Sequence, residues 1–415
     1  MLRSCSMITK GNDTILRLMS ESLAIYDQAL YYQRKKYFET KEQNKIKTYN
    51  YNELYNIVKE TETFKKSNMD YVLKQEQIRL VYKNWKSFIK ATIEYKKHSE
   101  KFKDKPKMPK YLYKRKKYST VFIDKTRFRS FKNNTFKIPC TDVIILCPKH
   151  IEHNSIRRVS IQPYYGKIKI NFIYDDLKYN DIQTDENIAM GIDIGLNNLC
   201  AITINDKYLS YVIKGGPLKS INQFYNKRKT DMVSNLMKCN KNQYTSHAIE
   251  RLNMKRKHKI YNYIHTVANK IIELSIENKV STIYVGHNKE WKQNIKLGRK
   301  NNQNFVSVPF NDLIEALKYK IEKFLYINLF IVEESYTSKC DHLVKETMEH
   351  HDNYLGKRVK RGLFKSSIGK ELNADINGAI GILRKGNAIS DDQIKILRDR
   401  GDIVSPKVLN NLTLK

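Results

Sequence analysis

Apolar residues in the first hundred positions recur every three or four residues, with lysines between them. The pattern is clearest in the stretches SESLAIYDQALYYQRKKYF and YVLKQEQIRLVYKNWKSFIKATIEY, and this period predicts amphipathic helices. Residues that break helices are scarce, because Gly11 is the only glycine and no proline occurs before Pro106. The sequence therefore predicts an N-terminal helical domain of the recognition type over residues 1–115.

Short runs of β-branched and aromatic residues, separated by turn residues, follow between about residues 120 and 174. The runs are TVFID, FKIP, DVIILC, RRVSIQPYY and KIKINFIYD. This pattern is typical of strands in a small β-barrel or sandwich. We expect a small β-barrel-like domain at residues 116–186.

From about Asn187 the pattern alternates between strand-like and helix-like segments. Long helices are expected at residues 245–278 and 310–324, and no internal repeat is present. The expected strands are IAMGIDIG, LCAITIN, YLSYVIK, TIYVG and LFIVEE. A run of strands followed by alternating helices and strands predicts a mixed sheet of the α/β class.

The charge of the chain indicates a polyanionic partner. Its 415 residues include 77 Lys and Arg against 43 Asp and Glu, a formal net charge of +34. Such an excess repels itself unless an anion neutralises it, which disfavours small-molecule metabolism and favours nucleic acid or an anionic surface. Residues 96–137 hold 16 Lys and Arg against three acids, with aromatic residues between them. That composition suits either a solvated linker or a segment whose cations contact phosphates while its rings stack on bases.

The cysteines and the apolar runs indicate in which cellular compartment the protein is expected. Six cysteines are scattered along the chain and no two are separated by just two residues, which excludes a disulfide scaffold and a Cys-x-x-Cys zinc ribbon. The N-terminus lacks the apolar segment of a signal peptide, and the longest dense apolar stretch, residues 324–332, is too short for a bilayer. We expect a soluble intracellular protein with reduced thiols and with no membrane or small-molecule partner.

Asp193 is an acid inside an apolar strand, in the string MGIDIGLNNLCAITIND, and Gly191 and Gly195 share its face of that strand. A buried carboxylate is costly without a cation or a donor, and flanking glycines let a phosphate or a backbone approach. RNase H/RuvC nucleases place a metal-binding Asp on this strand, whereas actin-like ATPases use an Asp-x-Gly there to hold a nucleotide-bound metal. An Asp that only closes a turn is the structural alternative.

Asp375 lies at the start of an amphipathic helix in the string NADINGAIGILRK. Alone, such an acid is often only a helix cap. Together with Asp193, it would supply two of the three carboxylates of a RuvC-like site, in which a third acid, usually Glu, lies between them in sequence. Oxygen ligands of this kind suit Mg²⁺ or Mn²⁺, and two such ions can activate a water and stabilise the leaving oxygen of a phosphodiester.

The chain resembles the OrfB/TnpB transposon-associated nucleases and their Fanzor-type eukaryotic and viral relatives, which are similar to the RuvC nuclease of type V CRISPR effectors. Most of the matching strings lie between residues 187 and 385, and QEQIRLVYKNWKSFIKA followed by KPKMPKYL resembles the N-terminal part of the family. The other strings are GIDIGLNNLCAITI, GGPLKSINQFYNKRK, YNYIHTVANKII, TIYVGHNKEWKQNIKLGRKNNQNFVSVPFNDLIEALKYKIEKF, EESYTSKCDHL, KYLYKRKK and GKRVKRGLFKSSIGKELNADINGA.

The resemblance implies an RNA-guided DNA endonuclease. Its bound guide RNA would pair with one strand of target DNA beside a short target-adjacent motif, and its RuvC-like domain would cut the DNA with Mg²⁺. Carried over by position, Asp193 matches the first catalytic acid of the family and Asp375 matches the last.

The middle acid departs from the commonest family pattern. Most relatives place a Glu at the end of the strand TIYVG, where this chain has Gly286. A subset has Gly there and an acidic pair before Tyr-Thr-Ser-Lys, and Glu333 and Glu334 form that pair here. Successive strand residues point to opposite faces, so only one of the two should face Asp193. We favour Glu334 over Glu333, with Glu290 as a weaker substitute.

Basic residues of the segment 96–137 and of the expected nuclease region are candidates for nucleic-acid contacts. They are Lys110, Lys114, Arg115, Lys116, Lys117, Lys219, Lys292, Lys339, Lys357, Arg358, Lys360 and Arg361. Relatives often carry two Cys-x-x-Cys pairs before the last Asp. Here residues 339–370 contain Cys340, His342, His350 and His351 without such a pair, so we expect a basic loop and no zinc.

Taken together, the patterns predict an RNase H-like (RuvC) nuclease domain of the α/β class, formed by residues 187–338 and a final helix at 371–395. The basic insert at 339–370 would interrupt it, and a C-terminal tail at 396–415 would follow. Other functions stay open: a cleavage-inactive protein that binds RNA or DNA, a transposase or its accessory protein, and an actin-like ATPase. The ATPase lacks a second glycine-rich phosphate loop, since ADINGA opens a helix instead.

Overall fold

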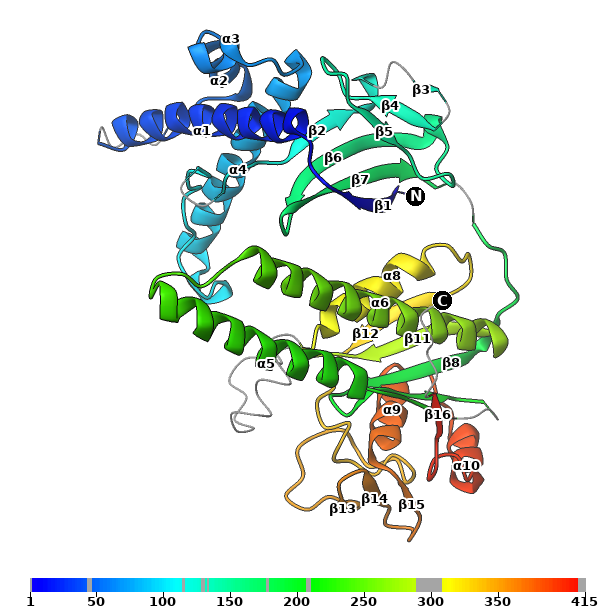
Figure 1. The fold of residues 1–415 in the computed structure, drawn as a ribbon. Coiled ribbons are helices and arrows are strands. Elements are labelled where there is room, and N and C mark those ends of the chain that lie inside the picture. The colour runs from blue at the N-terminus through cyan, green and yellow to red at the C-terminus, as the bar shows by residue number, and fades with distance from the viewer. Residues whose placement is uncertain are drawn as a thin grey trace. The chain divides into compact units, whose positions relative to one another are not determined.

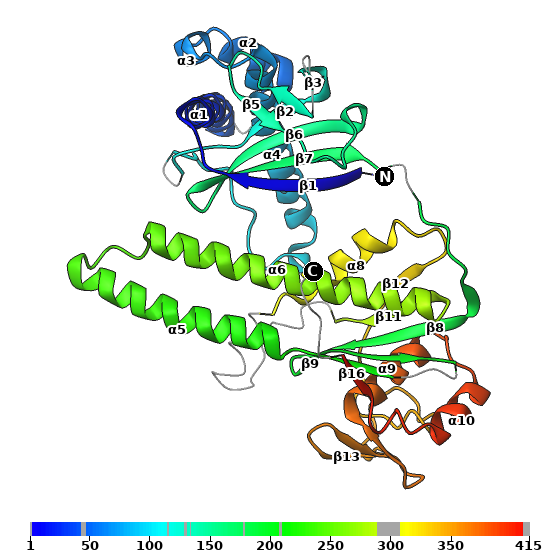
Figure 2. The same ribbon diagram turned by 45° about the vertical axis from the view of Figure 1, so that its right-hand side comes forward.

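The chain forms two compact units, Met1–Leu177 and Lys178–Lys415. Figures 1 and 2 show the elements of both units from two sides. In the described part of the chain, no helix is long and apolar enough to cross a membrane. The structure, a computed structural model, describes residues 2–42, 47–113, 116–127, 131–132, 134–176, 179–206, 210–288 and 308–409.

Four α-helices of the first unit lie where the apolar periodicity predicts helical structure. They are α1 (Asp13–Glu42), α2 (Tyr51–Val58), α3 (Glu62–Lys66) and α4 (Tyr71–Lys97). Polar side chains fix where three of them begin, because each accepts a hydrogen bond from an otherwise unpaired N–H of the first turn. Asn50 and Glu53 form a reciprocal capping box on α2, Thr61 caps α3, and Asp70 caps α4.

The strands of the first unit form two sheets. An antiparallel sheet has the order β1-β7-β6-β2, and a smaller one has the order β3-β4-β5. Among the described residues, no strand pairing closes either sheet into a barrel, so the expected barrel-like domain is observed as two open sheets. The strands are β1 (Leu2–Thr9), β2 (Val121–Asp124), β3 (Phe131–Lys132), β4 (Thr135–Lys137), β5 (Ile144–Leu146), β6 (Ile156–Tyr164) and β7 (Lys167–Asp175).

The start of the chain corrects the expectation of a purely helical N-terminal domain. Leu2–Thr9 is a strand that pairs antiparallel with β7, from Leu2 opposite Asp175 to Thr9 opposite Ile168. A partner so distant in sequence leaves no signal in a local pattern. Helices and strands also share one core, which includes Trp85 and Phe172. The expected border between residues 115 and 116 therefore does not separate two cores, and the unit ends at Leu177.

The second unit contains a six-stranded mixed sheet with the order β12-β11-β8-β9-β10-β16. Strands β8, β9 and β10 are antiparallel neighbours, whereas β11 and β12 run parallel to β8, and β16 runs parallel to β10. This arrangement agrees with the α/β class that the sequence predicts. The strands are β8 (Asp185–Ile194), β9 (Asn198–Ile204), β10 (Tyr211–Lys214), β11 (Val280–Gly286), β12 (Asn328–Val332) and β16 (Lys407–Leu409).

Helices cover both faces of this sheet (Figure 1). Alternate residues of β8, including Met190 and Ile192, are buried in one core with residues of α6 (His247–Glu277) and α8 (Phe310–Ile321). The opposite face of β8 carries Asp193 and packs against α9 (Ala374–Lys385). The period of two along β8 thus buries an apolar face and turns an acid toward α9.

The sequence missed several elements of the second unit. Helix α5 (Gly216–Cys239) runs beside α6 (Figures 1 and 2). The expected tail at 396–415 contains the end of α10 (Asp391–Asp399) and strand β16. The expected basic loop includes β13 (Lys357–Lys360) and β14 (Leu363–Lys365), which form a small sheet with β15 (Glu371–Asn373). These strands are three or four residues long, too short for a visible alternation.

Candidate active site

Asp193 lies near the end of β8, directly against the backbone of α9. A Cβ atom added to Gly191 would lie 2.4 Å from the carbonyl oxygen of Ala379, so only glycine permits this approach of helix and strand. A Cβ added to Gly378 would lie 2.8 Å from Oδ2 of Asp193. The two glycines therefore let the Asp193 carboxylate reach the first turns of α9, where Asp375 also lies.

Asp375 is in the first turn of α9 but is not the cap of that helix. The side chain of Asn373 accepts hydrogen bonds from the backbone N–H groups of Asp375 and Ile376, so Asn373 is the cap. The Asp375 carboxylate points elsewhere: its Oδ2 accepts a hydrogen bond of 2.7 Å from Nδ2 of Asn198, and its Oδ1 lies 3.4 Å from a guanidinium nitrogen of Arg358. Capping therefore does not explain the presence of this acid.

The side chains of the acidic pair after β12, Glu333 and Glu334, point in different directions. Glu333 is exposed and accepts a hydrogen bond from the hydroxyl of Ser335. The side chain of Glu334 instead covers Gly286, whose added Cβ would lie 2.8 Å from Oε1 of Glu334. Strand pairing explains this position, because Gly286 is in register with Val332, two residues before Glu334. The space of a side chain at position 286 is thus filled by Glu334.

Asp193 and Glu334 are brought to neighbouring strands in a poorly hydrated site. Val285, next to the Gly286 that Glu334 covers, is in register with Ile192, next to Asp193. Burial, and then the neighbouring carboxylates of Glu334 and Asp375, raise the pKa of Asp193 well above its ordinary value, and Arg358 opposes this rise. Burial raises the pKa of Glu334 to about 7, and Lys385 opposes it. The acids would therefore gain a favourable partner in a cation bound between them.

The donor set fits a hard divalent cation. Oε1 of Glu334 is buried and has no hydrogen-bond partner in the described structure, which is costly for a carboxylate. As they stand, no three His, Cys, Asp or Glu side chains of the described residues are grouped tightly enough to hold a metal ion, and Asp375 instead contacts Asn198 and Arg358. Carboxylate oxygens are the ligands that Mg²⁺ and Mn²⁺ prefer, so these residues suit such an ion.

A basic cavity of about 760 Å³ opens beside Asp375. Its walls come from the loop between β8 and β9, the end of β10, β13 with the turn after it, and the start of α9. The residues are Gly195, Leu196, Asn197, Asn198, Lys214, Arg358, Lys360, Arg361, Gly362 and Asp375. Three of the residues expected to contact phosphate therefore line it, and Lys219 binds the side chain of Asn197 at its edge. The sequence pattern missed Asn198 and Lys214, because a single Asn or Lys in a basic chain carries no distinguishing signal.

The remaining candidates are dispersed. Lys339 lies 5.6 Å from the ring centroid of Tyr354, and Lys357 is exposed on β13. Lys110, Lys116 and Lys117 are exposed in the first unit. Lys114, Arg115, Lys292 and the substitute acid Glu290 lie outside the described residues.

The four thiol and imidazole groups of the insert do not converge on one point. His342 is fully buried, and both its ring nitrogens have partners: Nε2 lies 2.8 Å from the carbonyl oxygen of Thr337, and Nδ1 lies 2.8 Å from Nη1 of Arg384. Because Arg384 can only donate, Nδ1 accepts and Nε2 carries the proton that binds Thr337. Cys340 is buried and its thiol donates to the carbonyl oxygen of Thr347, whereas His350 and His351 are less buried.

We expect the buried His342 to make the protein sensitive to acid. Burial lowers the pKa of His342 to about 4, from an ordinary 6.5. Between these values the unfolded chain binds a proton that the folded one excludes, so stability is complete above pH 6.5 and falls as the pH drops toward 4. The loss attributable to this group is at most about 3 kcal/mol.

Urea unfolding at several pH values between 7 and 4 measures this effect. The variant His342→Gln should show a shallower fall of the unfolding free energy than the wild type, while His350→Gln, an exposed control, should follow the wild type. Equal slopes in the wild type and His342→Gln would show that the histidine is not held neutral.

Gly286 gives a second prediction, because its missing side chain leaves the room that Glu334 occupies. An added Cβ would lie 2.5 Å from Cδ1 of Ile382 and 2.8 Å from Cγ of Glu334. We expect Gly286→Ala to lower the unfolding free energy by about 1–3 kcal/mol. Gly216→Ala is the matched control, because its added Cβ has nothing within 4 Å.

The test of this packing is a double-mutant cycle measured by urea unfolding. In the background Glu334→Ala, the cost of Gly286→Ala should shrink by about 1 kcal/mol, because one of the two clashing groups is gone. Strictly additive effects would mean that Glu334 does not lie over Gly286.

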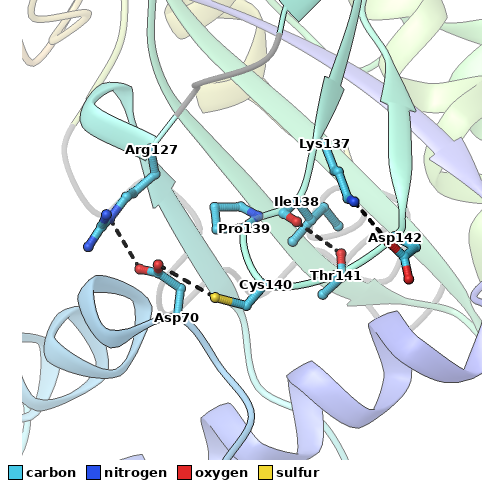
Figure 3. Close-up of a pocket in the computed structure, with 8 residues that line it drawn as sticks. All are labelled: Asp70, Arg127, Lys137, Ile138, Pro139, Cys140, Thr141 and Asp142. Atoms are coloured by element: carbon cyan, nitrogen blue, oxygen red, sulfur yellow. Dashed lines mark hydrogen bonds and ion pairs between the residues drawn. The ribbon is translucent and has the colours of Figure 1, made fainter.

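A second cavity, of about 460 Å³, lies in the first unit and was not predicted (Figure 3). Its charged residues pair with one another: Arg127 with Asp70 at 3.2 Å, and Lys137 with Asp142 at 2.8 Å. The thiol of Cys140 lies 3.9 Å from Asp70, which also caps α4. These internal pairs tie the start of α4 to the strand region, which is a structural role.

Comparison with known proteins agrees with this geometry. Residues 175–292 match the OrfB_IS605 family model, described as a probable transposase. The TnpB-like protein ORF457 of Acidianus two-tailed virus is 24% identical over 218 residues, which is 50% of this chain and 44% of the viral protein. These two matches confirm the resemblance to the OrfB/TnpB proteins. The aligned part spans less than half the length of the viral relative.

A solved structure shows the shared fold. Cas12f1, in the cryo-EM structure of its complex with sgRNA and target DNA, superposes with a TM-score of 0.54 at 15% identity, over 89% of this chain and 82% of that chain. The fold of the second unit is compatible with an RNase H-like nuclease.

Proposed function

We propose that this protein is a transposon-associated, RNA-guided DNA endonuclease that hydrolyses phosphodiester bonds in a RuvC-like site with two metal ions. The observation that carries the proposal is the convergence of acids from β8, the end of β12 and α9, beside a basic cavity. The OrfB/TnpB matches and the fold shared with Cas12f1 support it at the level of the family. The proposed partners are a guide RNA and a target DNA.

The described residues divide the work of such a reaction. Bound Mg²⁺ or Mn²⁺ would activate the attacking water and stabilise the leaving oxygen, and Asp193, Glu334 and Asp375 would hold the ions. Asn198 fixes the direction of the Asp375 carboxylate, and Lys214 fixes the Asn198 amide by donating to its Oδ1 at 3.1 Å. This second contact leaves the amide NH₂ of Asn198 free to face Asp375.

The basic cavity would take the phosphodiester strand. Arg358 and Lys360 lie on β13 and Arg361 directly follows it, and all three line this cavity together with Lys214. Arginine suits this role because its planar guanidinium can donate two parallel hydrogen bonds to one phosphate. In the first unit, the exposed Lys110, Lys116 and Lys117, with the exposed ring of Tyr113 nearby in sequence, would contact guide RNA through phosphates and stacking.

The test of the RNA part is purification of the protein expressed together with its own locus. We expect co-purifying RNA whose removal by ribonuclease lowers solubility and protease resistance, because residues 96–137 lose the phosphates that neutralise them. Protein that carries no RNA, and is equally soluble and protease-resistant with or without it, would contradict this part of the proposal.

A further inference from the structure

Arg358 is held beside Asp375 by an anchored hairpin rather than by a loose loop. On β13 it lies opposite Phe364 of β14, a fully buried residue of the core that also contains Leu372 and Ile376. The residues of β13 itself are exposed. The hairpin therefore fixes where the Arg358 backbone lies and leaves its side chain room to move.

The two oxygens of Asp375 have different kinds of partner. Oδ2 accepts from the neutral amide of Asn198 at 2.7 Å, and that amide is itself fixed by Lys214. Oδ1 faces the positive guanidinium of Arg358 at 3.4 Å. In the described structure, Arg358 thus forms an ion pair with the same carboxylate that would bind a metal ion.

This ion pair is weak enough for Asp375 to exchange Arg358 for another cation. The side chains of Arg358 and Asp375 are 48% and 30% exposed, and their separation is longer than a good charge-assisted hydrogen bond. Pairs of this kind contribute little to stability. Asp375 could therefore exchange Arg358 for a divalent cation, with its double charge, at small cost.

Arg358 also has a second place to bind. It lines the same cavity as Lys360, Arg361 and Lys214, so a guanidinium that leaves Asp375 stays among groups that attract a phosphate. One rotation of the side chain would take it from the carboxylate to a phosphodiester in that cavity.

We propose that Arg358 is an exchangeable counter-ion of Asp375: it pairs with the carboxylate while no divalent cation is bound, yields to that cation, and then contacts the phosphodiester strand in the basic cavity. This inference rests on the proposed nuclease function. Arg358 is in this account a positioning residue for the metal site, and its removal has opposite effects on metal binding and on cleavage.

The first measurement is Mn²⁺ binding to the purified full-length protein without nucleic acid, followed by electron paramagnetic resonance at a fixed pH of about 8. Arg358→Gln should bind Mn²⁺ about three- to tenfold more tightly than the wild type, because a competing positive charge is gone. Arg358→Lys should stay near the wild type. Lys365→Gln, which removes a charge from the same hairpin outside the cavity, should also bind as the wild type does.

The second measurement is RNA-guided DNA cleavage at saturating Mn²⁺. Arg358→Gln should cut about tenfold more slowly or worse, since the phosphate loses a donor, while Lys365→Gln cuts normally. Equal or weaker Mn²⁺ binding by a folded Arg358→Gln would overturn the exchange, and an unchanged cleavage rate would overturn the phosphate contact. Asp193→Asn separates these failures from a failure of the proposed function: if it too binds Mn²⁺ as the wild type does, the carboxylate metal site itself is wrong.

Discussion

Asp193→Asn and Asp375→Asn are each expected to lower the rate of RNA-guided DNA cleavage by about 1,000-fold or more. Both variants keep the shape of the side chain, so the packing of Asp193 against Gly378 is preserved. What they remove is an anionic oxygen that would hold a metal ion. Retention of RNA should be unchanged, because the RNA contacts that we propose lie elsewhere in the chain.

The assay for this prediction is cleavage of a labelled target by the purified RNA–protein particle, with and without EDTA. Asp231→Asn is the matched control, since it makes the same chemical change at an exposed position of α5. Cleavage that persists in EDTA, or in either active-site variant, would contradict the assignment of two metal ions to these acids.

The acidic pair after β12 gives the second large effect. We expect Glu334→Gln to lower the cleavage rate by about 100-fold or more, whereas Glu333→Gln should change it by no more than about twofold, as is usual for an exposed substitution. The reason is geometric: Glu334 covers Gly286 on the strand beside that of Asp193, while Glu333 is exposed and contacts Ser335.

Each variant serves as the control for the other, because the two differ by one position and remove the same charge. Thermal melting should show both folded before their rates are compared. If Glu333→Gln is the inactive one, the assignment within the pair is reversed. If both cut at the wild-type rate, neither is the third acid and Glu290 becomes the next candidate.

Much of the architecture could be predicted because it depends on local periodicity. The runs IAMGIDIG and TIYVG became β8 and β11, and the apolar spacing of residues 245–278 became α6. What was missed depends on distant partners. Strand β1 is defined by pairing with β7, and β16 by pairing with β10, so neither has a signal within its own few residues.

In the candidate site, too, residues with a local signal could be predicted, whereas contacts between distant residues could not. Asp193 and Asp375 stand out because each is an acid in an apolar setting with a recognisable period. The position of Glu334 over Gly286, with Glu333 exposed, depends on the register of Gly286 with Val332, which only the folded sheet provides. The contacts of Asp375 with Asn198 and Arg358 join residues more than 15 positions apart, across separate elements. No spacing rule connects these three residues.

The central claim is that the sequence of the bound RNA determines where this carboxylate site cuts DNA. The most direct measurement exchanges the target-pairing segment of the co-purified RNA for an unrelated one and maps the cut on a DNA that contains both matching sites. We predict that the cut moves to the newly matched site, needs Mg²⁺ or Mn²⁺, and disappears in Asp193→Asn. A cut that stays at the original site, or that forms on both sites without RNA, would contradict the account.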